Sequence, residues 1–276
     1  MPGTAIKSTT YGLVIGLLMF NTVAILGSAH ACDYYYSITI AVNPTAICPS
    51  GCDLSPTTAT ATATLTLYGS PVSGKEVYFT ASGTGGGHSH NGTRPVGTFS
   101  PSHGTTNANG QVTSTYTASI AGGTYTLQAT SQGVFDTCSL DVRVSGLSLL
   151  GSGSYYTRKY CDVHHPEYHY GTSDTVSDLQ GVASDFHAAY PSANYLVYND
   201  MSLVKGGIFD YCSCPTCNGG HWQTPHSQHR VGRNCDLSNI EDYNTTQRNT
   251  LQSIIEQDYG GDVDPEGDHW HLTFPQ

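Results

Sequence analysis

The stretch Thr106-Asn107-Ala108-Asn109-Gly110-Gln111-Val112, followed by Ala121-Gly122-Gly123-Thr124-Tyr125-Thr126-Leu127, decides the fold of the N-terminal half. Each stretch contains a turn signal, Asn109-Gly110 or Gly122-Gly123, that leads into residues of alternating polarity. Such pairs favour tight turns, and alternation places apolar side chains on one face of a strand. The two stretches therefore predict short strands joined by turns.

The same pattern recurs over residues 33–145, which are rich in Thr, Ser, Gly, Ala and Tyr and poor in charge. The alternating segments are Tyr36–Val42, Ala61–Tyr68, Lys75–Ser82, Gln111–Ser119, Thr124–Thr130 and Cys138–Val144. Several short strands without a helical pattern predict an all-β sandwich. The two quoted stretches resemble bacterial immunoglobulin-like domains of surface proteins. The resemblance implies an immunoglobulin-like domain over residues 32–145 that acts as a spacer or adhesive module.

Residues 1–31 predict a signal peptide. Lys7 supplies a positive charge, Gly12–Leu26 is almost wholly apolar, and Ala29-His30-Ala31 provides a cleavage site of small residues. Cleavage there leaves Cys32 first, where a lipid anchor is an alternative fate of the mature chain. We therefore expect an exported protein that is periplasmic, cell-surface or extracellular.

Cysteine content, net charge and histidine content indicate which classes of protein this chain can belong to. Nine cysteines in an exported chain predict disulfides, although the sequence does not give their connectivity. The formal net charge is −11, and the Lys and Arg residues form no basic stripe, which argues against nucleic-acid binding. Of the thirteen histidines, nine lie between His164 and His271, and this clustering points to metal.

The C-terminal half has a different pattern. Residues 146–155 are rich in Gly and Ser and predict a linker. Ser173 is a helix-capping residue, and one helical face is apolar through Val176, Leu179, Val182, Phe186 and Ala189. Asn244–Tyr259 predicts a second helix, whereas Tyr195–Tyr198 and Trp270–Phe274 predict strands. Residues 156–276 are therefore expected to form an α+β domain with a small antiparallel sheet.

Three residues of this domain form a candidate metal site. Zinc binds histidine nitrogen and aspartate oxygen, and a catalytic zinc site has three protein ligands and one open position. His229, Asp236 and His271 supply such a set. His269 alternates with His271 along a strand, so both face the same side, and His269 is a candidate proton-transfer group.

The pattern Ser227-x-His229-x-x-Gly232-x-x-x-Asp236, followed by His269-x-His271, resembles the zinc D-alanyl-D-alanine carboxypeptidases. The segment Asn199-Asp200-Met201-Ser202 with Gly206-Gly207, together with His226, resembles the penicillin-insensitive murein endopeptidases. The resemblance implies a hedgehog- and lysostaphin-type peptidase fold. It also implies Zn²⁺ held by His229, Asp236 and His271, His269 as the catalytic residue, His226 close to the site, and peptidoglycan or another peptide as substrate.

Neighbouring residues are candidates for supporting roles. Asp210 and Asp268, with Glu266, are candidates to orient the imidazoles, and Arg230 is a candidate for oxyanion or carboxylate contact. The sequence departs from the resemblance at Asn234, where a small apolar residue is usual. It also has Lys205 and no Arg in the region that grips a substrate carboxylate, which favours an endopeptidase over a carboxypeptidase.

Two further groups of possible ligands are present. Cys212, Cys214, Cys217 and His221 have ligand types that suit a second zinc ion, but an oxidising compartment favours disulfides. His88, His90 and His103 lie in a Gly-rich stretch, and Gly85-Gly86-Gly87 favours a loop with solvated histidines.

The sequence supports two hypotheses from different classes. The first is a secreted zinc metallopeptidase acting on peptidoglycan peptides. The alternative is a non-catalytic cell-surface binding or adhesion protein whose C-terminal domain is a degenerate peptidase. The complete set of three ligands and His269 favours the enzyme, and the sequence does not give the oligomeric state.

Overall fold

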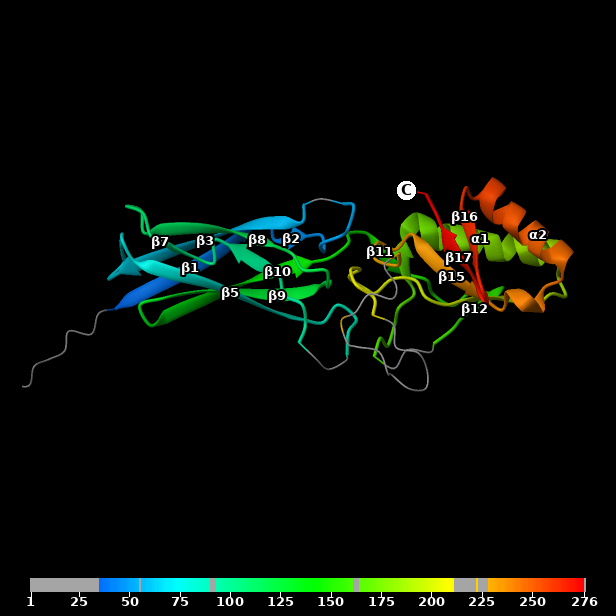
Figure 1. Cartoon of the computed structure of the whole chain (residues 1–276), viewed down its shortest axis with the longest axis horizontal. Coiled ribbons are helices and arrows are strands. Elements are labelled where there is room, and N and C mark those ends of the chain that lie inside the picture. The colour runs from blue at the N-terminus through cyan, green and yellow to red at the C-terminus, as the bar shows by residue number, and fades with distance from the viewer. Residues whose placement is uncertain are drawn as a thin grey trace, which may run out of the picture. The chain divides into compact units, whose positions relative to one another are not determined.

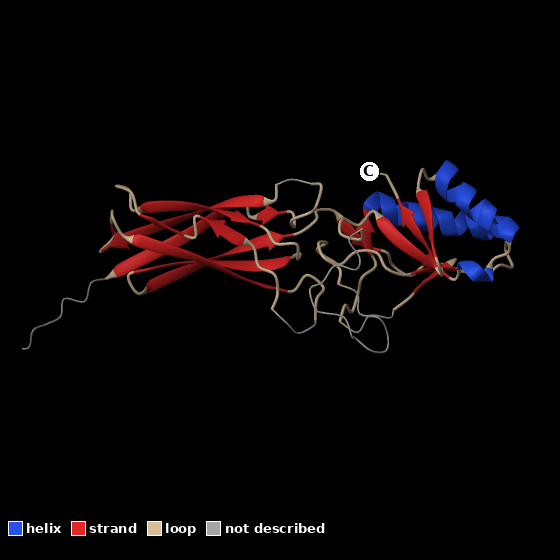
Figure 2. Cartoon of the chain, viewed as in Figure 1, coloured by secondary structure: helices blue, strands red, loops and turns tan. Residues whose placement is uncertain are grey.

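The computed structural model describes residues 35–54, 56–89, 93–160, 164–210, 222 and 228–275. The predicted signal peptide, Cys32, His226 and the Cys212–Cys217 group with His221 lie outside the described residues. From Tyr35 onward the chain forms one compact unit. Within the described residues, all helices belong to the C-terminal part, residues 146–275, as Figures 1 and 2 show.

The N-terminal part, residues 35–145, consists of two five-stranded sheets. The first has the order β1-β3-β8-β6, with β4 paired to β3, and its strands are β1 (Tyr36–Asn43), β3 (Thr58–Leu67), β4 (Ser70–Pro71), β6 (Thr98–Ser100) and β8 (Gln111–Thr117). The second has the order β2-β10-β9-β5-β7, and its strands are β2 (Ala46–Ile47), β5 (Glu76–Thr84), β7 (His103–Thr105), β9 (Gly123–Ser131) and β10 (Val134–Val142). All pairs are antiparallel except β2 with β10.

Alternating side chains from both sheets fill the space between them. In β3, Ala59, Ala61, Ala63 and Leu65 point inward while the intervening threonines point outward. These residues share one hydrophobic core with buried side chains of the second sheet, among them Leu127 of β9. The prediction of an all-β immunoglobulin-like sandwich is confirmed, because period-two alternation leaves only one apolar face for each strand to bury.

Tyr125 of β9 is fully buried in this core and bonds through its hydroxyl group. Its oxygen lies 2.8 Å from Ser119 Oγ and 2.7 Å from the carbonyl oxygen of Ala121. The cross-strand partner is Gly83, where a Cβ atom would lie 2.6 Å from the tyrosine ring. The ring therefore depends on a glycine opposite it and on two buried hydrogen bonds.

The C-terminal part contains a five-stranded sheet of order β12-β14-β15-β17-β16. Its strands are β12 (Tyr156–Arg158), β14 (Leu196–Tyr198), β15 (Asn234–Ser238), β16 (Asp262–Glu266) and β17 (His269–Thr273). Only β12 and β14 are parallel; the other pairs are antiparallel. The helical segments are α1 (Ser173–Ala189), a 3₁₀ turn (Ile240–Asp242), α2 (Thr245–Ser253) and the π-helical η2 (Ile254–Asp258). They share one core with the sheet, so this part is α+β.

Helix boundaries follow capping side chains. Thr172, rather than the predicted Ser173, caps α1, and its Oγ1 accepts a hydrogen bond from the Thr175 backbone nitrogen at 3.2 Å. Asn244 forms a capping box with Gln247 at the start of α2, where the sequence predicts the helix to begin. The shift by one residue at α1 arises because Thr and Ser both cap well, so tertiary contacts decide between them.

The predicted linker, residues 146–155, contains a strand. Strand β11 (Leu147–Leu149) pairs with β13 (Tyr170–Thr172), and Leu150 is fully buried in the C-terminal core. The predicted domain boundaries stay predictions. Among the residues that the structure describes, no helix combines the length and apolar character needed to cross a bilayer.

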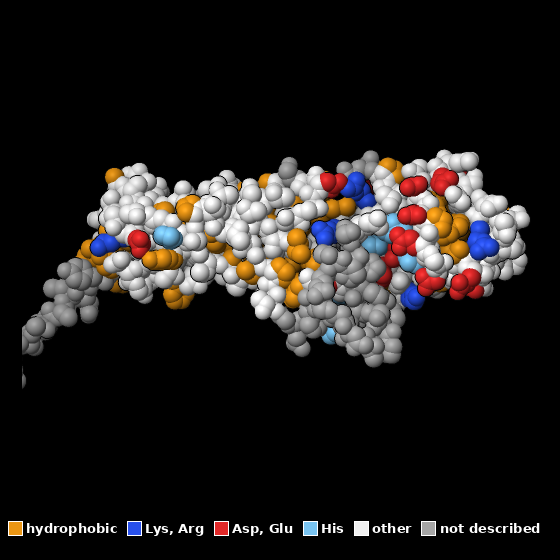
Figure 3. Space-filling model, viewed as in Figure 1, with side chains coloured by type: hydrophobic (Ala, Val, Ile, Leu, Met, Phe, Trp, Pro, Cys, Tyr) orange, Lys and Arg blue, Asp and Glu red, His pale blue; other side chains and the backbone are white. Residues whose placement is uncertain are grey.

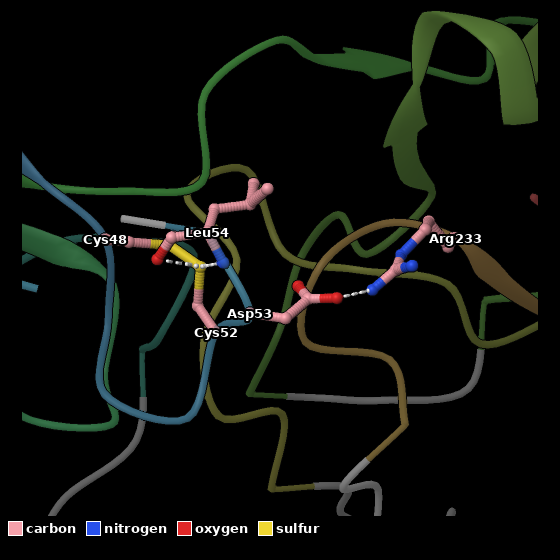
Figure 4. Close-up of a disulfide and its surroundings, with 5 residues drawn as sticks. All are labelled: Cys48, Cys52, Asp53, Leu54 and Arg233. Atoms are coloured by element: carbon pink, nitrogen blue, oxygen red, sulfur yellow. Dashed lines mark hydrogen bonds and ion pairs between the residues drawn. A yellow bond between two sulfur atoms is a disulfide. The ribbon is translucent and has the colours of Figure 1, made fainter. Parts of the chain in front are cut away.

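Residues 205–208 join the two parts through backbone hydrogen bonds. The nitrogen of Val144 donates to the oxygen of Lys205 at 2.9 Å, and the nitrogen of Ile208 donates to the oxygen of Ile120 at 2.7 Å. Asp53, next to the Cys48–Cys52 disulfide, forms an ion pair with Arg233 (Figure 4). Cys138 and Cys235 are free thiols.

We predict that Tyr125→Phe lowers the free energy of unfolding by about 1–3 kcal/mol, because Ser119 and Ala121 lose a buried partner. Urea denaturation followed by circular dichroism measures the change. The matched control is Tyr78→Phe. The hydroxyl of Tyr78 is exposed and donates a hydrogen bond to Glu76, so this substitution should change the free energy of unfolding by less than about 0.5 kcal/mol. Equal effects of the two substitutions would contradict the buried-network account.

Candidate functional site

The three predicted metal ligands meet at the centre of the C-terminal sheet. Asp236 of β15 is the direct register partner of His271 of β17, so their side chains lie on one face. His271 Nδ1 lies 2.8 Å from Asp236 Oδ1, and Nε2 of His229, from the loop before β15, lies 3.3 Å from the same oxygen. All three residues are buried, and their ligand atoms lie within 4.8 Å of one another.

The two histidines determine the charge of Asp236. Burial alone would raise the pKa of this carboxyl, but hydrogen bonds and electrostatic attraction from His229 and His271 outweigh burial and hold the pKa well below its usual value. The group is therefore a carboxylate at neutral pH. Two imidazole nitrogens and one carboxylate oxygen that converge in a buried position form a ligand set suited to zinc.

His269 and Asp268 lie beside this trio. The side chain of His269 is 27% exposed, more than those of the three ligands. Its Nε2 lies 3.8 Å from Asp236 Oδ2 and 3.6 Å from Glu266 Oε2, while its Nδ1 lies 3.0 Å from Asp268 Oδ1. The hydrogen bond to His269 lowers the pKa of Asp268. Figure 3 shows histidine and acidic side chains gathered near β15 and β17.

Asn234, where the sequence departs from the peptidase-like pattern, contacts one of the three predicted ligands. Its side-chain nitrogen lies 3.0 Å from His271 Nε2 and 2.8 Å from Thr273 Oγ1. A hydrogen bond at Nε2 fixes the orientation of the His271 ring, which presents Nδ1 to Asp236. A small apolar residue at position 234 would leave this nitrogen without that contact.

Two of the predicted supporting residues, Arg230 and Asp210, make their described contacts away from the three predicted ligands. Arg230 lies next to Gly51 of the disulfide loop, since a Cβ atom at Gly51 would lie 2.8 Å from its Nη1. Its backbone oxygen accepts a hydrogen bond from the nitrogen of Gly207 at 2.9 Å. Asp210 is brought not to the trio but to a second group of histidines.

This second group comprises His88, His165 and Asp210, with side chains 1%, 0% and 5% exposed. His165 Nε2 lies 3.1 Å from His88 Nδ1, and each of these nitrogens lies 3.3 Å from Asp210 Oδ1. Burial lowers the pKa of His88 to about 4, so its imidazole is neutral at pH 7. The expectation of a solvated His88 is wrong, because its loop packs onto the C-terminal part: the nitrogen of Ser89 donates to the oxygen of His164 at 2.8 Å.

His165 is not among the predicted site residues, and no local spacing in the sequence reveals this group. His88 and His165 are 77 positions apart and belong to different parts of the fold. A recognisable ligand motif relies on residues in one helix, strand or turn. Only the docking of the loop that carries His88 brings these residues together.

Three glycines of the peptidase-like pattern have packing roles. Gly206 and Gly207 have positive φ values, and a Cβ atom at Gly207 would lie 2.5 Å from the oxygen of Ile120. Gly232 also has a positive φ, and a Cβ atom there would lie 2.4 Å from the side chain of Leu147. These glycines are thus required where backbone and core of this protein approach closely.

Neither a protein-family model nor a curated protein sequence matches the chain. Among solved structures, it is similar to the D0–D1 domain of intimin, with 25% identity over 40% of this chain and 49% of that chain and a TM-score of 0.31. It is also similar to the C-terminal 282-residue fragment of intimin, solved in complex with the intimin-binding domain of the translocated intimin receptor. There the identity is 22% over 45% of this chain and 43% of that chain, with a TM-score of 0.30.

The adhesin InvE of Yersinia pseudotuberculosis is a further similar structure, with 13% identity over 87% of this chain and 70% of that chain and a TM-score of 0.38. The chain spans about half the length of the D0–D1 intimin structure. The similar structures named here are thus bacterial adhesins.

These findings correct the peptidase assignment. The matched structures are adhesins, and no family model or curated protein supports a zinc carboxypeptidase, a murein endopeptidase or a hedgehog-type peptidase domain. The predictions of a metallopeptidase and of a peptidoglycan or peptide substrate are therefore wrong. The physical reason is that a ligand pattern specifies local chemistry, which unrelated folds share, and does not specify a reaction. The catalytic role of His269 depended on that assignment and is not carried further, whereas the metal ligands stay a prediction.

Proposed function

We propose that this protein is a cell-surface binding protein of the adhesin kind. In this proposal, the immunoglobulin-like sandwich is the spacer, and the C-terminal part contacts a protein on an opposing surface. The predicted signal peptide supports export. The observation that carries the proposal is a stacked group of aromatic rings on the C-terminal part, formed by the exposed Tyr155 and Tyr195 and the partly buried His187.

The three rings contact one another. Tyr155 and His187 stack with ring centroids 4.1 Å apart and an interplanar angle of 13°. Tyr195 packs edge-on, 6.2 Å from Tyr155 and 6.0 Å from His187. Tyr155 and Tyr195 are nevertheless 36% and 47% exposed. None of the three rings belongs to the hydrophobic core of this part, so the exposed faces of the two tyrosines remain available to a partner.

The backbone beneath the rings is held by buried residues. The nitrogen of Leu196, which is fully buried, donates to the oxygen of Tyr155 at 3.3 Å, and the hydroxyl of Tyr243 donates to the oxygen of Tyr195 at 3.1 Å. Beside the rings, Asn194 bonds to Asp242 at 3.3 Å. A pre-ordered aromatic centre with a polar rim is the arrangement typical of protein interfaces, in which tyrosine is enriched among the residues that dominate affinity.

We further propose that His229, Asp236 and His271 hold a zinc ion. The ligand types fit, and the carboxylate is ionised. When Nδ1 of His271 binds zinc, the ring proton lies on Nε2, and the Asn234 amide, which contacts this nitrogen, can accept that proton through Oδ1 once it is rotated by 180°. Bound zinc would neutralise the buried carboxylate and cross-link β15, β17 and the loop before β15. In an adhesin such an ion stabilises the part that presents the aromatic rings.

We predict that Tyr155→Ala combined with Tyr195→Ala weakens binding to target cells by at least about 30-fold, because even one aromatic residue at the centre of an interface contributes about 2 kcal/mol or more. The measurement is the apparent Kd of fluorescently labelled protein on a panel of intact cells, by flow cytometry. Phe135→Ala is the matched control, because Phe135 is 66% exposed but lies in β10 of the sandwich. The proposal fails if the wild type shows no saturable binding, or if the double variant and the control bind equally.

We predict that His229→Ala binds one zinc ion fewer per chain than the wild type, and that Asn234→Ala weakens the affinity of this site about 10–100-fold. Metal analysis after dialysis gives the stoichiometry, and competition with a chromogenic chelator gives the affinity. His103→Ala, an exposed histidine of β7, is the control for the general loss of an imidazole. Unchanged zinc content in His229→Ala would contradict this assignment.

A further inference from the structure

We propose that His88, His165 and Asp210 form a second zinc site, which fastens the sandwich loop after β5 to the C-terminal part. This site is separate from the one at Asp236. Phe209 lies between the two groups, with its ring centroid 5.2 Å from that of His165 and 6.3 Å from that of His229.

The spacing of the three candidate ligand atoms matches one face of a zinc tetrahedron. Zinc–nitrogen and zinc–oxygen bonds of about 2.0–2.1 Å place neighbouring tetrahedral ligands about 3.3–3.4 Å apart. The distances here are 3.1 Å between His165 Nε2 and His88 Nδ1, and 3.3 Å from each nitrogen to Asp210 Oδ1. One ion can therefore reach all three atoms with little rearrangement.

Hydrogen bonds alone account less well for the short distances among these three atoms. Asp210 Oδ1 can accept from both imidazoles, but the two N–H groups would then crowd each other across the 3.1 Å contact between nitrogens. If a proton instead lies between the nitrogens, one of the nitrogens has none left for the carboxylate. A cation accepts a lone pair from each of the three atoms, so no two of them need to share a proton.

The surroundings hold these residues in the orientation a metal site requires. The second carboxylate oxygen of Asp210 accepts a hydrogen bond from the Trp222 backbone nitrogen, so Oδ1 faces the imidazoles. The Trp222 ring lies against His88 with centroids 4.6 Å apart, and the guanidinium of Arg94 lies 5.1 Å from the Trp222 ring centroid. Aromatic side chains thus exclude water from the site, and an outer contact fixes a ligand, as in metal centres generally.

The site is complete only when the sandwich loop is docked. His88 follows Gly85-Gly86-Gly87, all with positive φ, and a Cβ atom at Gly86 would lie 1.9 Å from the oxygen of Gly122. Ser89 donates to the oxygen of His164 from both its backbone nitrogen and its hydroxyl, at 2.8 and 2.6 Å. His165 and Asp210 belong to the C-terminal part, so an ion bound by all three residues would link the sandwich loop to the C-terminal part.

The test uses the full mature chain with zinc alone as the probe. We expect His165→Ala and the near-isosteric Asp210→Asn each to bind one zinc ion fewer than the wild type, and His229→Ala combined with His165→Ala to bind two fewer. Adding zinc at about 100 times the Kd of each site should raise the wild-type Tm by about 10–20 °C, of which each site contributes about half. The part of this rise that belongs to the second site should be absent from Asp210→Asn and present in the control His103→Ala.

Hydrogen exchange provides a readout specific to the loop. If zinc binds only the docked loop, exchange of the Ser89 amide should slow by up to about 100-fold at that zinc concentration in the wild type and in His229→Ala, but not in Asp210→Asn. Circular dichroism shows whether each variant is folded. Unchanged zinc content in folded Asp210→Asn, or zinc protection of Ser89 that survives in it, overturns the proposal. These measurements do not involve cell binding, so failure of the adhesion proposal would leave them unaffected.

Discussion

The antiparallel register of β15 with β17 is the constraint on which the C-terminal part depends. It places Asp236 opposite His271 and Cys235 opposite Leu272. Since successive side chains of a strand face opposite sides, Leu272 enters the core with Leu237 while Asp236 and His271 share the other face. A slip of one residue would put the carboxylate into the apolar core. The core and the polar cluster therefore stabilise the same register.

Two buried aspartates, Asp236 and Asp210, follow the same physical rule. An isolated buried carboxylate costs several kcal/mol, so it persists only with compensating partners. Each of these aspartates has two imidazoles within 3.3 Å of one oxygen. The imidazoles are therefore the partners that compensate the burial of each carboxylate.

The wrong prediction of a peptidase has a physical origin in the spacing of the ligands and glycines. The ordered pattern from His229 to His271 describes how two strands bring three ligands together, and the structure does bring them together. The glycines that strengthened the pattern have separate causes: Gly207 permits close approach to the backbone of Ile120, and Gly232 makes room for Leu147. An agreement of glycines with a family pattern can therefore arise from local packing alone.

The sequence by itself determined the elements whose pattern is local. Alternation in residues such as 58–67 fixed the strands of the sandwich, the Asn244 capping box fixed the start of α2, and His269-x-His271 placed two histidines on one strand face. The tertiary structure alone decided contacts between distant segments. The exposed stack of Tyr155 on His187 and the group formed by His88, His165 and Asp210 are two such cases. Side-chain periodicity reports which face of an element is buried, whereas long-range docking decides which distant residues meet there.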